Sequence, residues 1–538
     1  MATTITGTSV TSDGLVTNTL GTSNFVAGVN AGNSITSGGN YNTVVGDEAG
    51  TAITTGDNNT AVGQDALKST TTADHNTAVG QAALYTNTTG ATNTAVGRAS
   101  MYANTTGGAN TAVGYAALNT NTTGANNTAV GFQSGLANTT GSSNTSLGHN
   151  SLISNTTASF NTAFGRSALQ ANTTGAENTA TGYNSQRDTT TGNYNTSNGS
   201  GSLAVNTTGS SNVAMGLNAL VANTTASNNT AVGTFALTAN TTAPDNTAIG
   251  SNTLQANTTG EENTAIGKFA LYANTTANAN TAVGKASLKD NTTGQENTAN
   301  GYNTLTDNTT GNNNTAIGYN ALWKNTTGST NTAVGTGSST ACTTGINNTT
   351  TGAASGISLT TGDNNLLLGH DAGRSGSPGG IITTQNSYIV LGDENINSAN
   401  IQVDWTVASD QRDKTDFTAL DLGLDFVNAL APVTYKWDKR SKYGDKTAEG
   451  YDLNAQTPDG THKEDWLDIG FKAQEVEALE IAAGYNKSNS TNLISSHTSD
   501  GKQMGLQYSK FVPILVKAIQ ELSTQNAALA ARLTALEA

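Results

Sequence analysis

The chain has 538 residues, a formal net charge of −15, and only 11% charged and 5% aromatic residues. A surface that binds nucleic acid needs clustered Lys and Arg, so this balance argues against a nucleic-acid partner. The single cysteine, Cys342, leaves no intrachain disulfide, and the five scattered histidines have no cysteine partners at metal-ligand spacing. We therefore expect no metal and no cofactor.

Residues 1–41 are rich in Thr, Ser and Gly, and we expect them to form a cap or attachment segment that includes a degenerate first repeat at residues 24–28. The amino terminus lacks a basic segment followed by an apolar one, and the chain contains no run of about 18 apolar residues. We expect neither a conventional secretion signal nor membrane insertion.

Residues 42–380 are built on one short repeat. An Asn followed four positions later by a Gly recurs twenty times with an unbroken 17-residue period. Asn110 and Gly114, and the next pair Asn127 and Gly131, belong to the commonest version, Asn-Thr-Ala-Val-Gly. A fixed short period indicates stacked units that cover one another's apolar faces. The predicted fold is mainly β, a fibrous β-solenoid or β-prism.

Within each repeat, Thr-Ala-Val has the β-branched, alternating character of a short strand, and the following Gly can adopt a positive φ at a corner. A second strand and turn are predicted at the Asn-Thr-Thr-Gly segment that completes most repeats. The third residue after the repeat Asn is apolar in 16 of 20 units, and we expect it to point inward. The exceptions are Thr181, Asn198, Asn300 and Thr351.

The repeated Asn allows two interpretations. Its side-chain amides can stack along the axis, each donating to the next, as in the Asn ladders of stacked strands. Alternatively, the Asn occupies a corner in the left-handed region of φ and ψ. One Val and one Leu per repeat make a thin core, so we expect several chains to share one core. Whether each chain coils by itself or three chains interleave stays open.

Beyond the repeats the composition changes. Residues 375–380 read as a linker, and conventional strands are predicted at 387–392 and 401–405, so that residues 381–408 form a β neck. Three of the four tryptophans lie beyond residue 400, together with much of the Lys, Arg and Glu. This composition is typical of a globular domain, and a separate α+β domain is predicted over residues 409–538.

The chain ends in a predicted helix that starts near Ser509 and tolerates Pro513 in its first turn. Its apolar residues are spaced by alternating steps of three and four around Asn526, as in the seam of a coiled coil over about residues 509–538. A polar Asn in such a seam fixes register and strand number. The alternative is an amphipathic helix packed on its own domain. The seam residues are Val512, Leu515, Ile519, Leu522, Leu529, Leu533 and Leu536.

Four motifs in order resemble the intramolecular chaperone domain of phage endosialidases and tail fibres. They are residues 408–414 (Ala-Ser-Asp-Gln-Arg-Asp-Lys), 430–435 (Leu-Ala-Pro-Val-Thr-Tyr), 470–476 (Gly-Phe-Lys-Ala-Gln-Glu-Val) and Tyr508 followed by the terminal helix. The repeats also resemble those of phage fibre proteins and the head repeats of trimeric autotransporter adhesins.

The resemblance implies a homotrimeric C-terminal domain that aligns three chains and then cuts itself off as a serine peptidase. In that family a Ser and a Lys five residues later form the catalytic pair. Carried over, Ser409 is the nucleophile, Lys414 is the base, and the scissile bond is Ala408–Ser409. Asp410 and Arg412 also match the motif, with roles left open.

The chemistry of this pair is sensible, because a Ser hydroxyl is a poor nucleophile until a neighbour takes its proton. A lysine can take that proton only where burial or nearby positive charge favours its neutral form. Arg412 would help in this respect, whereas Asp410, Asp413 and Asp416 would oppose.

The expected function is that of a structural phage tail fibre, assembled in the host cytoplasm and carried on the virion. Its partners would be a tail or baseplate protein at the amino terminus and a host receptor or surface polysaccharide. The alternatives are a polysaccharide-degrading tailspike, a bacterial adhesin-like fibre and an ice-binding solenoid. A glycosidase needs paired carboxylates, and the acidic turn residues have no recurring partner. These residues are Asp47, Glu48, Glu261 and Glu262.

Overall fold

The computed structural model describes residues 19–402, 405–446, 450–489, 491 and 493–538, and the chain forms two compact units, residues 1–314 and 315–538. Residues 1–18, the first part of the expected attachment segment at 1–41, lie outside the described residues. No helix in the described parts of the chain is long and apolar enough to cross a membrane. The domain limits expected at residues 380 and 409 stay predictions.

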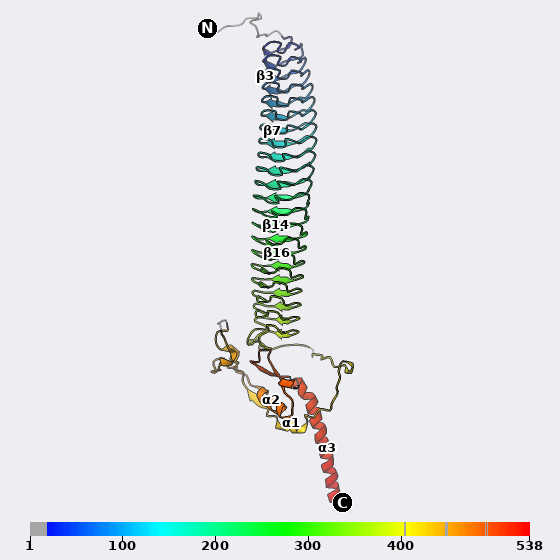
Figure 1. The fold of residues 1–538 in the computed structure, drawn as a ribbon, viewed down its shortest axis with the longest axis vertical. Coiled ribbons are helices and arrows are strands. Elements are labelled where there is room, and N and C mark those ends of the chain that lie inside the picture. Colours follow the sequence, from blue (N-terminus) through cyan, green and yellow to red (C-terminus); the bar gives the residue numbers. More distant parts are fainter. Residues whose placement is uncertain (1–18, 403–404, 447–449, 490, 492) are drawn as a thin grey trace. The chain divides into compact units, whose positions relative to one another are not determined.

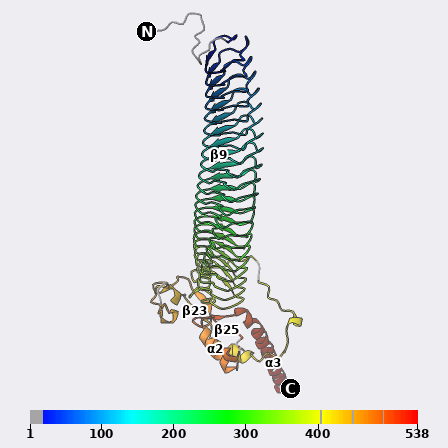
Figure 2. The same cartoon turned by 45° about the horizontal axis from the view of Figure 1, so that its top comes forward.

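The first unit is a parallel β-solenoid. Figure 1 shows β3, β7, β14 and β16 stacked in chain order, and Figure 2 shows successive turns repeating one outline. The strands are β1 (Phe25–Ala27), β2 (Thr43–Val45), β3 (Thr60–Val62), β4 (Thr77–Val79), β5 (Thr94–Val96), β6 (Thr111–Val113), β7 (Thr128–Val130), β8 (Thr145–Leu147), β9 (Thr162–Phe164), β10 (Thr179–Thr181), β11 (Thr196–Asn198), β12 (Val213–Met215), β13 (Thr230–Val232), β14 (Thr247–Ile249), β15 (Thr264–Ile266), β16 (Thr281–Val283) and β17 (Thr298–Asn300).

Each strand pairs with the equivalent strand of the next repeat. Between β6 and β7, for example, Ala112 lies opposite Ala129 and Val113 opposite Val130. One sequence repeat is therefore one complete coil. The chain forms its own solenoid, and interleaving of three chains is not needed to pair its strands.

The prediction that the third residue after the repeat Asn points inward is wrong. In β6 it is Ala112 that is fully buried, whereas Val113 is only half-buried, and Ile249 at the same position in β14 is 39% exposed. The reason is the two-residue period of a strand. Because the side chain of Asn110 is buried, Ala112 shares its side and Val113 faces outward.

The core of each turn therefore consists of small residues and amides. Ala112 is packed with Leu118 from the following bend, and both are buried. Most turns place a Leu at this bend position, as Leu84, Leu169 and Leu237 do, and all of these are fully buried. A cross-section this narrow explains why Ala rather than Val lies on the inner side of the strand.

The expected Asn ladder is present. Asn127 donates two hydrogen bonds to Oδ1 of Asn110, one from its backbone N (2.9 Å) and one from its side-chain Nδ2 (3.1 Å). Nδ2 of Asn127 also donates to Gly141 O (2.9 Å). A second ladder links Asn121 to Asn104, with Nδ2 to Oδ1 at 2.8 Å. The alternative of an Asn in the left-handed region is wrong at this position, because that conformation belongs to the preceding residue, as at Ala109 (φ 57°).

The Gly after each strand makes the predicted corner. Gly114 has φ 138°, and a Cβ on it would lie 2.4 Å from the carbonyl oxygen of Gly131 in the next turn. Both the conformation and the close stacking of turns exclude a side chain here.

The predicted second strand at Asn-Thr-Thr-Gly is wrong. Residues 121–124 form a bend without regular strand structure. They still hydrogen-bond between turns, since Thr122 N donates to Thr139 O (2.8 Å) and the Thr122 hydroxyl donates to the same oxygen (3.0 Å). The Thr residues thus support the stacking through both backbone and side chain.

The second unit begins with further solenoid strands and continues into a smaller α+β part. The solenoid strands are β18 (Thr315–Ile317), β19 (Thr332–Val334), β20 (Thr349–Thr351), β21 (Leu366–Leu368) and β22 (Ile389–Leu391). The strand predicted at 387–392 is therefore one more solenoid turn, in which Ile389 pairs in parallel with Leu366 of β21 across a longer coil. The strand predicted at 401–405 is not formed by Ile401, Gln402 or Trp405, and residues 403–404 lie outside the described residues.

The remainder of this unit contains short elements and one long helix. The helices are η1 (Gln411–Asp413), α1 (Leu424–Ala429), η2 (Arg440–Lys442), η3 (Leu453–Ala455), α2 (Ala473–Ala482), η4 (Lys487–Asn489), η5 (Tyr508–Lys510) and α3 (Phe511–Glu537). The strands form two antiparallel pairs, β23 (Val433–Tyr435) with β24 (Asp468–Gly470) and β25 (Ser495–His497) with β26 (Met504–Leu506).

The predicted terminal helix is α3, and only one side of its first turns packs on its own unit. Phe511, Ile514 and Ala518 are buried, the first two in a cluster with Phe426 of α1 and Val476 of α2. All seven residues of the predicted seam are exposed, from 43% at the least exposed to 83%. The packed side and the seam are therefore different sides of one helix.

Candidate functional site

The structure brings the predicted pair Ser409 and Lys414 together. Nζ of Lys414 donates a hydrogen bond of 2.6 Å to Oγ of Ser409. Between them the chain makes the single turn η1, which ends where Lys414 N donates to Gln411 O. This turn brings two residues that are five positions apart into direct contact, so the spacing has a local structural cause.

Asp410 and Arg412 hold that turn. The carboxylate of Asp410 caps η1 by accepting from Arg412 N (2.9 Å), and it also forms an ion pair with the Arg412 guanidinium (Nη2 to Oδ2, 2.6 Å). The hydrogen bonds from Arg412 lower the pKa of Asp410 below its ordinary value. The positive charge expected to assist Lys414 is therefore paired with a neighbouring carboxylate, and both residues act as positioning groups for the turn.

The pair lies in the open. Ser409 and Lys414 are exposed, and so are Trp405 (73%), Val407 (79%) and Phe417 (67%) on either side of them. A lysine works as a base only where burial or positive charge favours its neutral form. One chain thus supplies the contact between nucleophile and base but not the burial that the chemistry requires.

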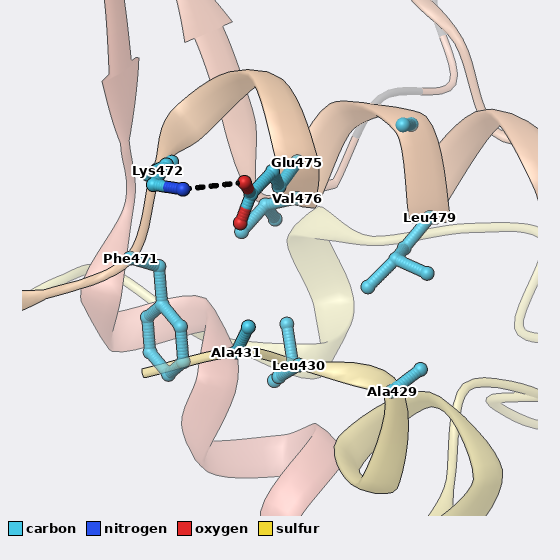
Figure 3. Close-up of a pocket in the computed structure, with 9 residues that line it drawn as sticks. Ala429, Leu430, Ala431, Phe471, Lys472, Glu475, Val476 and Leu479 are labelled. Atoms are coloured by element: carbon cyan, nitrogen blue, oxygen red, sulfur yellow. Dashed lines mark hydrogen bonds and ion pairs between the residues drawn. The ribbon is translucent and has the colours of Figure 1, made fainter. Parts of the chain in front are cut away.

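Two of the motifs that carried the resemblance meet around a pocket of about 280 Å³ (Figure 3). It is bordered by residues 429–431 on one side and by Phe471 and α2 on the other, and most of its lining is apolar. Its charged residues, Lys472 and Glu475, form an ion pair with each other at 2.7 Å. The lining has no Ser, Thr or Cys, and its two charged groups are paired with each other, so we assign no reaction to this pocket.

Tyr508 links the third motif to the terminal helix. Its hydroxyl accepts a hydrogen bond from Phe471 N (3.2 Å), and a Cβ on Gly470 would lie 2.5 Å from that hydroxyl oxygen. Gly470 therefore leaves the space into which Tyr508 reaches. This contact joins two of the motifs directly.

The other residues singled out from the sequence have structural positions. Asn526 lies on the exposed part of α3. Glu48 and Glu262 adopt left-handed turn conformations (φ 54° and 58°), and Glu48 is paired with Lys68 at 2.9 Å. In the described residues these carboxylates are placed as turn residues on the surface of the solenoid.

A cluster of His370, Asp371 and Asp393 was not expected from the sequence, and the potential ligand atoms of these residues all lie within 4.8 Å of one another. They follow Gly369 and Gly392, on turns that stack. Burial raises the pKa of Asp393, but hydrogen bonds from Asn395 and His370 outweigh it and leave the pKa below its ordinary value. Asp371 is paired with Arg374 at 3.1 Å, so the cluster already has cationic partners.

A column of aromatic rings was also missed, although the repeat period would reveal it. At the position after the corner Gly, the rings of Tyr115, Phe132 and His149 stack with centroids 5.2 Å apart. Arg98 occupies the same position one turn earlier, and its guanidinium lies 5.8 Å from the centre of the Tyr115 ring. Stacked rings at the spacing of the turns strengthen the contact between neighbouring turns.

Residues 409–485 match the family model described as "chaperone of endosialidase". The match begins at Ser409, the predicted nucleophile, and includes Lys414 and the motifs at 430–435 and 470–476. No curated protein and no solved structure was found that matches the chain.

Proposed function

We propose that the chain is a structural tail fibre protein of a phage, in which the solenoid is the rod and the C-terminal domain aligns three chains and then cleaves itself. A long parallel β-solenoid followed by a match to the endosialidase chaperone model fits a tail fibre with a C-terminal chaperone domain. The observation that carries the cleavage proposal is the 2.6 Å hydrogen bond between Lys414 and Ser409, at the first residues of that match.

The proposed reaction uses the peptide bond next to the nucleophile. Neutral Lys414 takes the proton from Oγ of Ser409, and Oγ attacks the carbonyl carbon of Ala408. The bond from that carbon to the Ser409 nitrogen breaks, and the nitrogen receives the proton from Lys414. Water then hydrolyses the resulting ester, which leaves a carboxylate on Ala408, restores the Ser409 hydroxyl and frees the amino group of Ser409.

Trimer formation is proposed because two exposed apolar features need a cover. The seam of α3 projects apolar side chains away from its packed face, and three large apolar residues flank the Ser–Lys pair. Neighbouring chains on these surfaces would bury Lys414 and so supply what a single chain lacks. Cleavage would then wait for assembly.

The remaining partners follow from the role of a fibre. The amino-terminal segment would attach to a phage tail or baseplate protein, and the rod surface would meet a host receptor or polysaccharide. The proposed location is the virion, after assembly in the host cytoplasm.

The cleavage proposal is tested by intact-mass analysis of purified wild type, Ser409→Ala and Lys414→Arg. We expect two pieces from wild type, residues 1–408 and 409–538, and one uncut chain from each variant. Arg keeps the positive charge and the ability to donate but cannot be deprotonated, so it removes only the base.

The matched control is Thr415→Ala, which removes an exposed hydroxyl next to Lys414 and should leave cleavage intact. Uncut wild type in an assembled sample, or a cut Ser409→Ala chain, would refute self-cleavage at this bond.

A further inference from the structure

The outer side of the strand ladder in the first unit carries an apolar stripe that is interrupted at three strands. In strands β2–β17 the first outward residue is Thr, or Val in β12, and the third is a residue that is either half-buried or exposed. Thirteen of the sixteen third residues are apolar. In chain order they are Val45, Val62, Val79, Val96, Val113, Val130, Leu147, Phe164, Met215, Val232, Ile249, Ile266 and Val283.

This stripe contains no charge, although the chain has a net charge of −15. None of the outward residues of β2–β17 is Asp, Glu, Lys or Arg. Charged residues occur instead at both margins of the strand. Arg98 and Arg166 stand two residues after the stripe position, and Glu177 and Glu262 stand just before the repeat Asn. An apolar centre free of charge with a charged rim is typical of a protein–protein interface.

We propose that this stripe is the surface on which further copies of the same chain pack, parallel and in register. The inference rests on the proposed homotrimer and adds the surface through which the rods associate. The argument for a copy of this chain is the repeat itself. A partner must present apolar groups at the same rise per turn over sixteen turns, and a second solenoid with the same coil does so.

The register follows from the interruptions of the stripe. Thr181, Asn198 and Asn300 replace the apolar residue in β10, β11 and β17. In a closed ring of identical chains with its axis along the rod, equivalent turns lie at one level. Asn198 then meets Asn198 of its neighbours and can hydrogen-bond with it. A slip of one turn between two chains would set one Asn198 against Met215, and a slip of two turns would set it against Phe164 or Val232, all of them apolar.

Asn526 repeats this arrangement in the second unit. It is the polar residue within the exposed apolar seam of α3, and a polar residue in such a seam specifies register. Polar interruptions therefore mark register on two separate surfaces of the chain.

The test is disulfide crosslinking of full-length Ser409→Ala chain, so that self-cleavage cannot separate the parts. Val113→Cys places a thiol on the stripe, and Val232→Cys repeats the test seven turns away. Thr123→Cys, at an exposed bend between β6 and β7, is the matched control. Chain without an added cysteine is the background, since Cys342 is fully buried and burial raises the pKa of its thiol to about 11.

After mild oxidation, Val113→Cys and Val232→Cys should give covalent dimers on a denaturing gel. The fraction of chains in the covalent dimer should not exceed about two of every three, because the three equivalent thiols of one trimer form only one disulfide. Thr123→Cys should stay monomeric. Register is tested by co-expressing Val113→Cys chain with a tagged Leu147→Cys chain. Two turns separate these positions by about 10 Å along the axis, more than a disulfide spans, so mixed dimers should be absent.

The outcomes separate this inference from the function on which it rests. An assembled sample in which Val113→Cys does not crosslink, or crosslinks no more than Thr123→Cys, overturns the stripe and leaves the trimer standing. Abundant mixed dimers overturn the register. A folded monomer overturns both proposals, and a monomer with thermal hysteresis would assign the face to ordered water instead.

Discussion

Gly114 shows how strongly the stacking of turns restricts a single position. A side chain there would require a φ of 138° and would meet the Gly131 carbonyl at 2.4 Å. We expect Gly114→Ala to destabilise the solenoid by about 2 kcal/mol or more, since a strained backbone conformation alone costs about 1–3 kcal/mol. The measurement is the midpoint of thermal unfolding followed by circular dichroism.

The matched control for this prediction is Gly108→Ala. Gly108 has no positive φ, and its nearest neighbour for an added Cβ is the Ala91 carbonyl at 3.1 Å. A loss as large as that of Gly114→Ala would show that the corner conformation is not the cause.

The buried Asn ladder gives a second prediction for a single residue. Oδ1 of Asn110 accepts two hydrogen bonds from Asn127, and its Nδ2 donates to Asn93 and to Gly124 O. Asn110→Ala would leave several of these buried groups unpaired, at about 1–3 kcal/mol for each. We expect a loss of about 2–5 kcal/mol in the free energy of unfolding by denaturant.

The exposed residue Thr123 supplies the comparison for the ladder. Thr123→Ala should change the free energy of unfolding by less than about 0.5 kcal/mol, as surface substitutions usually do. Equal losses for the two variants would contradict the view that the ladder is a main source of stability.

Among the helices, one carboxylate adds a polar contact to the apolar packing between α1 and α3. Glu521 of α3 accepts a hydrogen bond from Leu424 N at the start of α1 (2.7 Å), and this bond lowers the pKa of Glu521 below its ordinary value of 4.5. A carboxyl with a lowered pKa in the folded state stabilises the fold above its unfolded value, and the effect is lost as the pH falls through the lower folded value.

We therefore expect the Leu424 amide to exchange with solvent faster as the pH falls from 5 toward 3, after correction for the intrinsic pH dependence of exchange. In Glu521→Gln the corrected rate should be independent of pH over the same range, since Gln keeps an acceptor oxygen but does not titrate. The measurement is hydrogen exchange of the uncut Ser409→Ala chain. If the corrected rate in the Ser409→Ala chain with Glu521 intact did not change with pH, the role of Glu521 would be contradicted.

The solenoid could be predicted from sequence because its period is a property of the chain itself. The corner at Gly114 and the ladder at Asn110 follow from one backbone conformation and one amide, both repeated twenty times. The outward direction of the Val113 side chain could not be predicted in the same way. The alternation of a strand leaves two phases open, and only the burial of the Asn side chain selects the one that turns Val113 outward.

The Ser–Lys pair could be predicted through its motif, and the structure adds the η1 turn that joins Ser409 to Lys414. The spacing alone does not show that Asp410 and Arg412 pair with each other. The cluster of His370 with Asp393 escaped prediction for a different reason. The coil that pairs Leu366 with Ile389 is longer than the regular repeat. His370 and Asp393 come together only because of this irregular coil, which the repeat period does not predict.

Taken together, the features left exposed on one chain are those that association would cover. The outward stripe of the first unit is mostly apolar and half-buried or exposed, the seam of α3 is exposed, and Trp405, Val407 and Phe417 near Ser409 are exposed apolar residues. If copies pack on the proposed stripe, burying half-exposed apolar side chains would contribute roughly 0.5–1 kcal/mol on each turn that carries one. Over many turns this would exceed the cost of bringing chains together, so the proposed assembly would stabilise the rod.

The most direct test of this account is sedimentation equilibrium of the full-length Ser409→Ala chain at several concentrations. If three chains assemble, we expect one species with three times the 54.5 kDa mass of a single chain. A well-folded species of 54.5 kDa at every concentration would contradict it.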